Sequence, residues 1–152
     1  KDLVVVSPDT GRAKFAKKLG DKLGAELAIM HKTRPNHNVA EIVNIVGNVE
    51  GKTVLLVDDM VDTAGSITSG LETLRKFGCN DDIYVATTHP VLSGPAIERL
   101  KGANITEFIA TDTMPLPDEK SFPSLKVLST ANLLAEVIRR NIEKKSIAPL
   151  FI

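Results

Sequence analysis

The chain alternates short, wholly apolar runs with stretches in which apolar residues recur every three or four positions. The first pattern is typical of strands buried on both faces of a sheet, and the second is typical of helices that cover it. The strongest strand pattern lies at residues 53–58. Further strands are expected at residues 3–7, 27–31, 41–46, 83–88, 105–110 and, at an edge, 125–128. Helices are expected at residues 12–23, from about 67 to 77, 95–101 and 131–144.

Strands that alternate with helices predict a doubly wound, mostly parallel α/β sheet with helices on both faces. No repeat, low-complexity tract or linker interrupts the pattern, so residues 1–152 are expected to form a single domain. Ligands of such sheets bind at the carboxyl ends of strands, where the topology changes direction. The polar residues that directly follow a strand are therefore the candidates for function.

Composition and charge limit what the chain can recognise. Apolar residues make up 43% of the 152, and 19 basic residues balance 19 acidic ones. No net field therefore favours nucleic acid or an anionic membrane as a partner, and a charged ligand has to be recognised locally. Cys79 is the only cysteine, which excludes an internal disulfide. Neither a signal peptide nor an apolar run of about 18 residues is visible, so a cytoplasmic location is expected.

Two adjacent carboxylates, Asp58 and Asp59, stand at the end of the strongest strand. At a buried strand end they repel each other and lose hydration, so a partner has to compensate them. Mg²⁺, donor hydroxyls or backbone N–H groups can do so. The vicinal hydroxyls of a ribose are well suited, because a carboxylate can accept two hydrogen bonds from a diol.

A small, hydroxyl-bearing loop follows and leads into a helix; it consists of Asp62, Thr63, Ala64, Gly65 and Ser66. Successive N–H groups at a helix start, the helix dipole and two hydroxyls form a cradle for an anion such as a 5-phosphate. Asp62 is close enough to act on the sugar or on its phosphate end. The alternative is a solvated strand end with a plain N-cap, but the whole run after a buried strand favours a binding loop.

The run VDDMVDTAGSIT, at residues 57–68, resembles the phosphoribosyl diphosphate-binding motif of the phosphoribosyltransferase superfamily. In its DDMVDTAG form it is similar to that of the ribose-phosphate pyrophosphokinase family. The similarity extends over nearly the whole chain, through VVVSPD (4–9), HKTRPNHNVAE (31–41), ATTHPVLSGPAIERL (86–100) and ANLLAEVIRR (131–140). The part resembled is the carboxyl-terminal half of that enzyme, whose two halves are related α/β domains. The absence of an initiator Met also leads us to expect a piece of a longer protein.

The resemblance implies Mg²⁺-dependent transfer of diphosphate from ATP to the anomeric hydroxyl of ribose 5-phosphate, giving phosphoribosyl diphosphate and AMP. Asp58 and Asp59 would then hold the ribose hydroxyls, with or without Mg²⁺. The 5-phosphate would lie in the cradle of Thr63, Ala64, Gly65 and Ser66, with Asp62 assisting. The full-length enzyme is expected to be a homo-oligomer. Its other half supplies parts of the Mg²⁺ and adenine sites, so the isolated chain is expected to turn over weakly or not at all.

Three further residues take their expected roles from the resemblance. Asp9 ends the first strand, where a turn and helix cap is the plain interpretation, and the family's Asp at this position contributes to a Mg²⁺ site. Lys32 and Arg34, in an expected exposed loop at 32–38, match mobile catalytic cations that stabilise charge on the transferred group and on the leaving AMP. One position departs from the family: Arg12 stands where a second Gly is common, and it can contact phosphate or merely start the helix.

Three other functions share parts of this pattern. A base-using phosphoribosyltransferase shares the loop but needs a segment to cover its nucleobase, and no residues are spare to build one. A non-catalytic regulatory paralogue would be expected to lack Lys32, Arg34 or the acidic pair, all of which are present. A response-regulator receiver also carries acidic residues at strand ends, but it takes a phosphoryl group on Asp.

Overall fold

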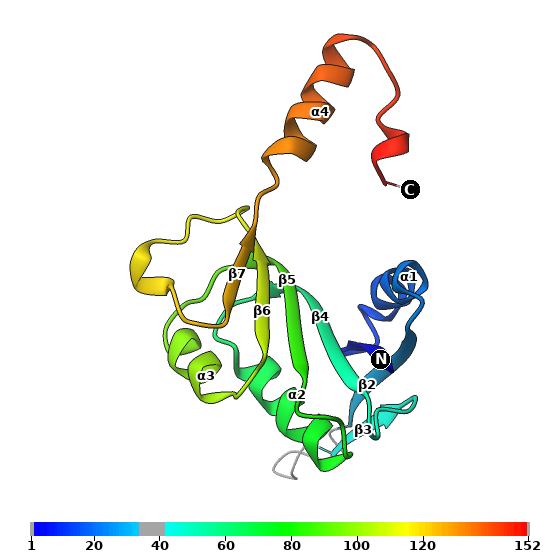
Figure 1. The fold of residues 1–152 in the computed structure, drawn as a ribbon, viewed down its shortest axis with the longest axis vertical. Coiled ribbons are helices and arrows are strands. Elements are labelled where there is room, and N and C mark those ends of the chain that lie inside the picture. Colours follow the sequence, from blue (N-terminus) through cyan, green and yellow to red (C-terminus); the bar gives the residue numbers. More distant parts are fainter. Residues whose placement is uncertain (1, 34–41, 152) are drawn as a thin grey trace.

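The computed structural model describes residues 2–33 and 42–151 of the chain. In this part, strands and helices alternate as the apolar pattern predicts (Figure 1). In chain order the elements are β1 (Leu3–Ser7), α1 (Ala13–Leu23), β2 (Glu26–Thr33), β3 (Ile42–Val46), β4 (Thr53–Val61), α2 (Gly65–Lys76), β5 (Ile83–Pro90), α3 (Ala96–Gly102), β6 (Glu107–Thr111), η1 (Asp118–Lys120), β7 (Leu125–Leu128), α4 (Ala131–Ile142) and η2 (Ala148–Phe151).

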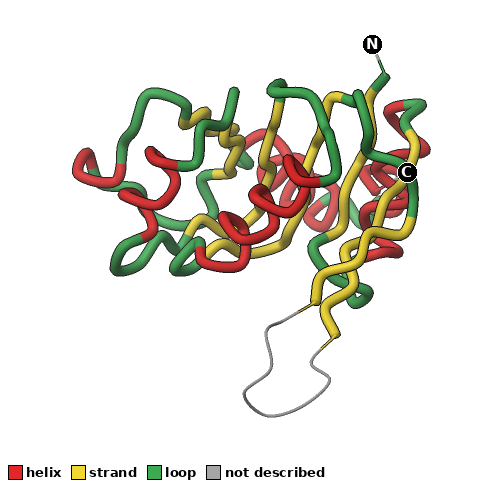
Figure 2. Tube along the Cα trace, turned by 90° about the horizontal axis from the view of Figure 1, so that it is seen from below, coloured by secondary structure: helices red, strands yellow, loops and turns green. Residues whose placement is uncertain are grey.

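The strands form one seven-stranded sheet in the order β3-β2-β1-β4-β5-β6-β7. All neighbouring strands are parallel except β2 and β3, which pair antiparallel and extend beyond the other strands (Figure 2). From β1 the chain proceeds outward to β2, whereas from β4 it proceeds outward in the opposite direction to β5. The topology therefore changes direction between β1 and β4, and the ligand site of such a sheet is expected at their carboxyl ends. The predicted mostly parallel α/β sheet is confirmed.

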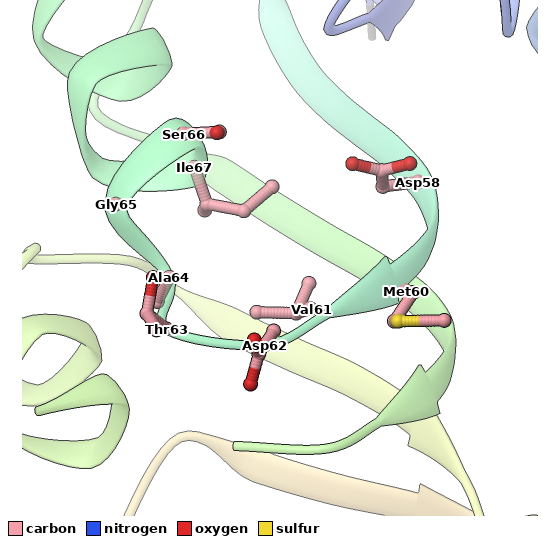
Figure 3. Close-up of a pocket in the computed structure, with 9 residues that line it drawn as sticks. All are labelled: Asp58, Met60, Val61, Asp62, Thr63, Ala64, Gly65, Ser66 and Ile67. Atoms are coloured by element: carbon pink, nitrogen blue, oxygen red, sulfur yellow. The ribbon is translucent and has the colours of Figure 1, made fainter. Parts of the chain in front are cut away.

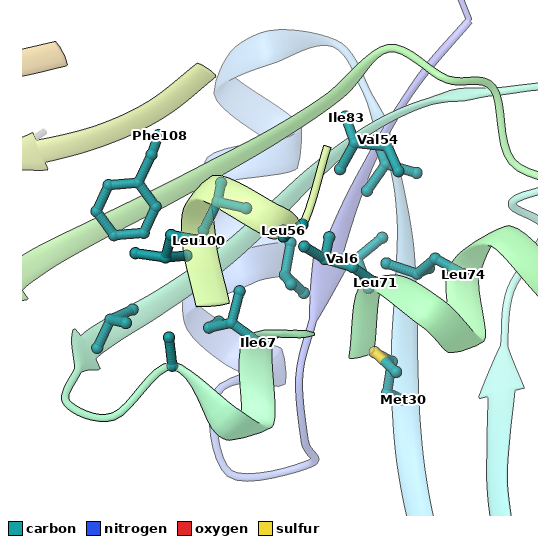
Figure 4. Packing of buried hydrophobic residues seen from close by; sticks show 14 of the residues in the cluster. Val6, Met30, Val54, Leu56, Ile67, Leu71, Leu74, Ile83, Leu100 and Phe108 are labelled. Atoms are coloured by element: carbon teal, nitrogen blue, oxygen red, sulfur yellow. The ribbon is translucent and has the colours of Figure 1, made fainter. Parts of the chain in front are cut away.

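Side chains that alternate along the strands divide the apolar core between the two faces of the sheet. Val6 and Leu56 belong to the larger cluster, which contains residues of α2 and α3 (Figure 4). Val5 and Val57 belong to the smaller cluster, which contains Ala16 of α1. Helices therefore cover both faces of the sheet.

Helix α4 projects from the end of β7, away from the sheet (Figure 1). Within the described residues it contributes no buried side chain, and its Leu134, Ile138 and Ile142 are 56%, 60% and 78% exposed. An apolar hollow of about 360 Å³ lies on the α1 side of the sheet, with Phe15 and Ile109 among its lining residues. Among the described residues no helix is both long and apolar enough to cross a membrane.

Four strands end later than the sequence predicts, namely β2, β4, β5 and β6. β4 runs to Val61 because Met60 and Val61 pair with His89 and Pro90 of β5, so the expected end at residue 58 is wrong. β2 runs to Thr33 because its last residues pair with β3. The expected exposed loop at 32–38 therefore begins too early, and the backbone of Lys32 belongs to a strand.

Candidate functional site

A cavity of about 180 Å³ lies between the end of β4 and the start of α2 (Figure 3). Asp58 stands on one side of it and the turn that leads into α2 stands on the other. The cavity is lined by Asp58, Met60, Val61, Asp62, Thr63, Ala64, Gly65, Ser66 and Ile67. The structure therefore gathers one contiguous stretch of sequence, which contains most of the predicted binding residues, around a single hollow.

The two adjacent carboxylates of β4 have different surroundings. Asp58 lines the cavity and also the apolar hollow on the α1 side, whereas Asp59 lines neither and is contacted by Arg12 at the start of α1. The Asp59 N–H donates a hydrogen bond of 2.9 Å to Asp58 Oδ1. The pair is thus offset rather than side by side, and each carboxylate has a different set of neighbours.

The pKa of Asp58 is raised to about 6, first by burial and then by the neighbouring Asp59 and Asp9 carboxylates, against the lowering effect of the hydrogen bond from the Asp59 backbone N–H. The charged form of Asp58 is therefore destabilised in the folded chain, and a bound partner can offset this destabilisation. A cation or a hydroxyl donor would favour the charged carboxylate. This electrostatic frustration is typical of binding and catalytic sites.

Replacing Asp58 by asparagine is expected to stabilise the fold at neutral pH. Below about pH 4 the carboxyl is protonated in both states, and between about pH 4 and pH 6 only the folded chain keeps the proton. The free energy of unfolding of the wild type should therefore fall relative to Asp58→Asn across this window. The difference should then stay constant above it, on the order of 1 kcal/mol because Asp58 is partly exposed. Urea unfolding at several pH values measures it, and a pH-independent difference would contradict the assignment.

The turn into α2 is shaped by Ala64, whose φ of 59° lies in the left-handed region that alanine rarely adopts. This conformation reverses the chain so that α2 begins at once with Gly65. The first N–H groups of an α-helix have no partner inside the helix, and here those of Gly65 and Ser66 belong to residues that line the cavity. The arrangement suits an anion, as the sequence predicts.

Two residues outside the predicted site, Ser93 and Arg99, donate hydrogen bonds to this turn. Ser93 donates from its backbone N–H to the Asp62 carbonyl oxygen at 3.1 Å, and its hydroxyl donates to the Asp62 carboxylate. Arg99 of α3 donates from Nη1 to the Thr63 carbonyl oxygen at 2.9 Å. The Asp62 carboxylate is therefore already bound, which favours a role in fixing the loop. Sequence analysis missed Ser93 and Arg99 because they are 31 and 36 residues away from their partners.

Asp9 and Arg12 lie on the other side of the switch point, at the end of β1. The Arg12 N–H donates to Asp9 Oδ1 at 3.0 Å, so Asp9 closes the turn that precedes α1 and does not cap the helix itself. The Arg12 guanidinium donates from Nη2 to Asp59 Oδ2. Arg12 therefore joins the ends of β1 and β4. Of the two predicted catalytic cations, Lys32 has its backbone in β2 and Arg34 lies outside the described residues.

The acidic residues at the switch point fit Mg²⁺ in one particular way. Carboxylate oxygens are suitable donors for Mg²⁺, and the charge of Asp9 is felt at Asp58. Within residues 2–33 and 42–151, however, no three His, Cys, Asp or Glu side chains are grouped to hold a metal ion. Mg²⁺ often uses only one or two carboxylates together with water and phosphate oxygens. The residues therefore fit a Mg²⁺ ion that is shared with a ligand.

Comparison with known proteins agrees with the motif. The family model of the phosphoribosyl synthetase-associated domain matches residues 35–152. The chain is 48% identical over 151 residues to a ribose-phosphate pyrophosphokinase of Corynebacterium ammoniagenes and 53% identical over 155 residues to one of Synechococcus elongatus. Each match covers 99% of the chain but only 47% and 46% of the relative. The chain thus spans about half the length of these curated relatives.

Solved structures give the same result. A phosphoribosylpyrophosphate synthetase from Mycobacterium smegmatis has a TM-score of 0.87 and 46% identity, over 95% of this chain and 46% of that protein. An orotate phosphoribosyltransferase from Aeropyrum pernix has a TM-score of 0.57 at 20% identity, over 88% of this chain and 64% of that protein, which shows a shared fold alone. Together with the family model, the first of these matches shows that the chain belongs to the phosphoribosyl synthetase-associated domain family, that of the ribose-phosphate pyrophosphokinases.

Proposed function

We propose that this chain supplies the ribose 5-phosphate site of a ribose-phosphate diphosphokinase. The complete enzyme would transfer diphosphate from ATP to the anomeric hydroxyl of ribose 5-phosphate and give phosphoribosyl diphosphate and AMP. One observation carries the proposal: a single cavity has a carboxylate on one side and a helix N-terminus on the other. A sugar phosphate carries a diol and a phosphate, which are the two groups that these sides suit.

The proposed pose follows from the two sides of the cavity. Asp58 and Asp59 would accept hydrogen bonds from the ribose hydroxyls, which relieves their mutual repulsion. The phosphate would accept hydrogen bonds from backbone N–H groups and hydroxyls of the turn, namely Thr63, Ala64, Gly65 and Ser66. Asp62 would keep this turn in place through Ser93, because its carboxylate is already hydrogen-bonded there.

Charge stabilisation during transfer is proposed for Lys32 and Arg34. The transferred group and the leaving AMP both gain negative charge in the transition state, and two positioned cations lower the energy of that charge. Asp9, Asp58 and Asp59 are the candidates to hold Mg²⁺, which when bound would neutralise phosphate charge. Since Asp9 already accepts a hydrogen bond from Arg12, we expect it to act through water or as a single ligand.

The longer protein is proposed to be a cytoplasmic homo-oligomer. Support comes from the exposed apolar side chains of α4 and from the apolar hollow on the α1 side of the sheet. Contiguous apolar surface on a folded protein usually marks an interface. The cytoplasmic location follows from the proposed substrates, ATP and a sugar phosphate. That the chain is the carboxyl-terminal half of the longer protein also stays a proposal, which rests on the resemblance.

The isolated chain is expected to bind ribose 5-phosphate but to release AMP from ATP slowly or not at all. It carries the proposed sugar phosphate cavity but spans only about half the length of its relatives. Calorimetric titration measures binding, with unphosphorylated ribose as the control ligand, and a coupled assay measures AMP. Absence of ribose 5-phosphate binding would refute the proposed site. Robust AMP release would refute the need for further protein segments.

A further inference from the structure

The guanidinium of Arg12 forms an ion pair with Asp59, a carboxylate that we propose accepts hydrogen bonds from the sugar. Its Nη2 atom donates to Asp59 Oδ2 across the gap between the ends of β1 and β4. Both side chains are more than 40% exposed, so the contact is open to solvent. Asp59 is therefore paired with a side chain of the same chain.

The local structure of α1 does not require this contact. Arg12 has ordinary backbone angles (φ −100°), and its side chain makes no capping hydrogen bond to the helix. The bond to Asp9 comes from the Arg12 backbone N–H, which every residue except proline can supply. Asp59 is thus the partner that accounts for the position of the Arg12 guanidinium.

We infer that Arg12 competes with the ribose hydroxyls for Asp59, so that the sugar binds only when this ion pair opens. The inference rests on the proposed function, because it requires Asp59 to accept hydrogen bonds from ribose. The Arg12 guanidinium holds Asp59 Oδ2, so a diol that donates to both oxygens of this carboxylate has to displace that donor. Arg12 then sets the affinity of the site without touching the sugar.

The size of the effect follows from the exposure of the pair. Solvent-exposed ion pairs are weak, so opening this one should lower the affinity for ribose 5-phosphate only about 1.5- to 5-fold. The competition therefore adjusts binding and does not block it.

Calorimetric titration with ribose 5-phosphate in Mg²⁺-free buffer tests the inference. Arg12→Ala and Arg12→Gln should each bind about 1.5- to 5-fold more tightly than the wild type, whereas Arg12→Lys should stay close to it. Lys17→Ala is the matched control, because it removes the same charge from an exposed ion pair of α1, the pair with Asp21. It should leave the affinity unchanged. In an Asp59→Asn background, Arg12→Ala should have no effect, since the competitor has lost its partner.

The outcomes separate this inference from the proposed function. Unchanged or weaker binding by Arg12→Ala, with a normal thermal unfolding curve, would overturn the competition. Weaker binding would mean that the guanidinium contacts the phosphate instead. An equal gain in affinity for Lys17→Ala would show that the loss of one positive charge explains the tighter binding, and it would also overturn the competition. A wild type that does not bind ribose 5-phosphate would overturn the proposed function, and the competition with it.

Discussion

Asp59→Asn should weaken the binding of ribose 5-phosphate about 10- to 150-fold. A hydrogen bond to a charged group contributes about 1.5–3 kcal/mol, and the substitution removes the charge while keeping the shape of the side chain. Asp59 follows Asp58 at the end of β4 and is partly exposed, and the proposed pose places a ribose hydroxyl on its carboxylate. Calorimetric titration of both proteins, with and without Mg²⁺, measures the change.

Asp21→Asn provides the matched control for this substitution. Asp21 is also an exposed carboxylate paired with a cation, Lys17, but it lies on α1 and outside the cavity. The control should bind as the wild type does. If Asp59→Asn and the wild type bind ribose 5-phosphate with equal affinity, Asp59 does not accept hydrogen bonds from the ribose hydroxyls. The proposed competition by Arg12 would then be refuted as well.

Phe108→Ala should destabilise the fold by about 3–5 kcal/mol, since it leaves a cavity in the larger core cluster. Phe108 of β6 is completely buried, and its ring centroid lies 5.7 Å from that of Phe122. This ring pair joins the connection before β7 to the sheet. The midpoint of urea unfolding measures the loss.

Phe15→Ala is the comparison for the core substitution. Phe15 is 50% exposed and lines the apolar hollow on the α1 side of the sheet, so its removal should change the free energy of unfolding by about 0.5 kcal/mol or less. A loss at Phe15 as large as that at Phe108 would contradict the structure. It would show that the hollow is covered in solution.

The kinds of elements and the fold class were predictable because the sheet is buried on two faces. Wholly apolar runs such as Val4–Val6 indicate strands that are buried on both faces. The spacing of Ile67, Leu71 and Leu74 indicates a helix with one apolar face. Each expected strand and helix is present in the described residues, although their ends differ. The strand ends depend on a partner: β4 continues to Val61 because β5 pairs with it there, which a local pattern cannot reveal.

The candidate site was predictable where its residues are contiguous. Every residue that lines the cavity falls between Asp58 and Ile67, with Asp59 left out, so a motif can identify it. The residues that hold the site from other parts of the chain were not predictable. Ser93, Arg99 and Arg12 contact Asp62, Thr63 and Asp59 across 31, 36 and 47 residues of sequence. The left-handed conformation of Ala64 was also not foreseen, since alanine gives no signal for it.

The role of each site residue stays a prediction. Geometry supports the cradle and Asp58, because both line one cavity, whereas Asp59 is outside that lining and pairs with Arg12. Arg34 lies outside the described residues, and Lys32 is described only through its strand. The proposal for these two cations therefore depends on the family motif. Substituting Lys32 or Arg34 would be informative only in the longer protein, where turnover is expected.

Binding of ribose 5-phosphate by the loop between β4 and α2 can be tested most directly by following backbone amide resonances during a titration. The largest shifts should appear at the N–H groups of Thr63, Ala64, Gly65 and Ser66, with smaller ones at Asp58 and Asp59. Unphosphorylated ribose should leave the first group nearly unchanged. Saturating ribose 5-phosphate that shifts no resonance in this loop, or shifts residues around Phe15 and Ile109 most, would contradict the proposed site.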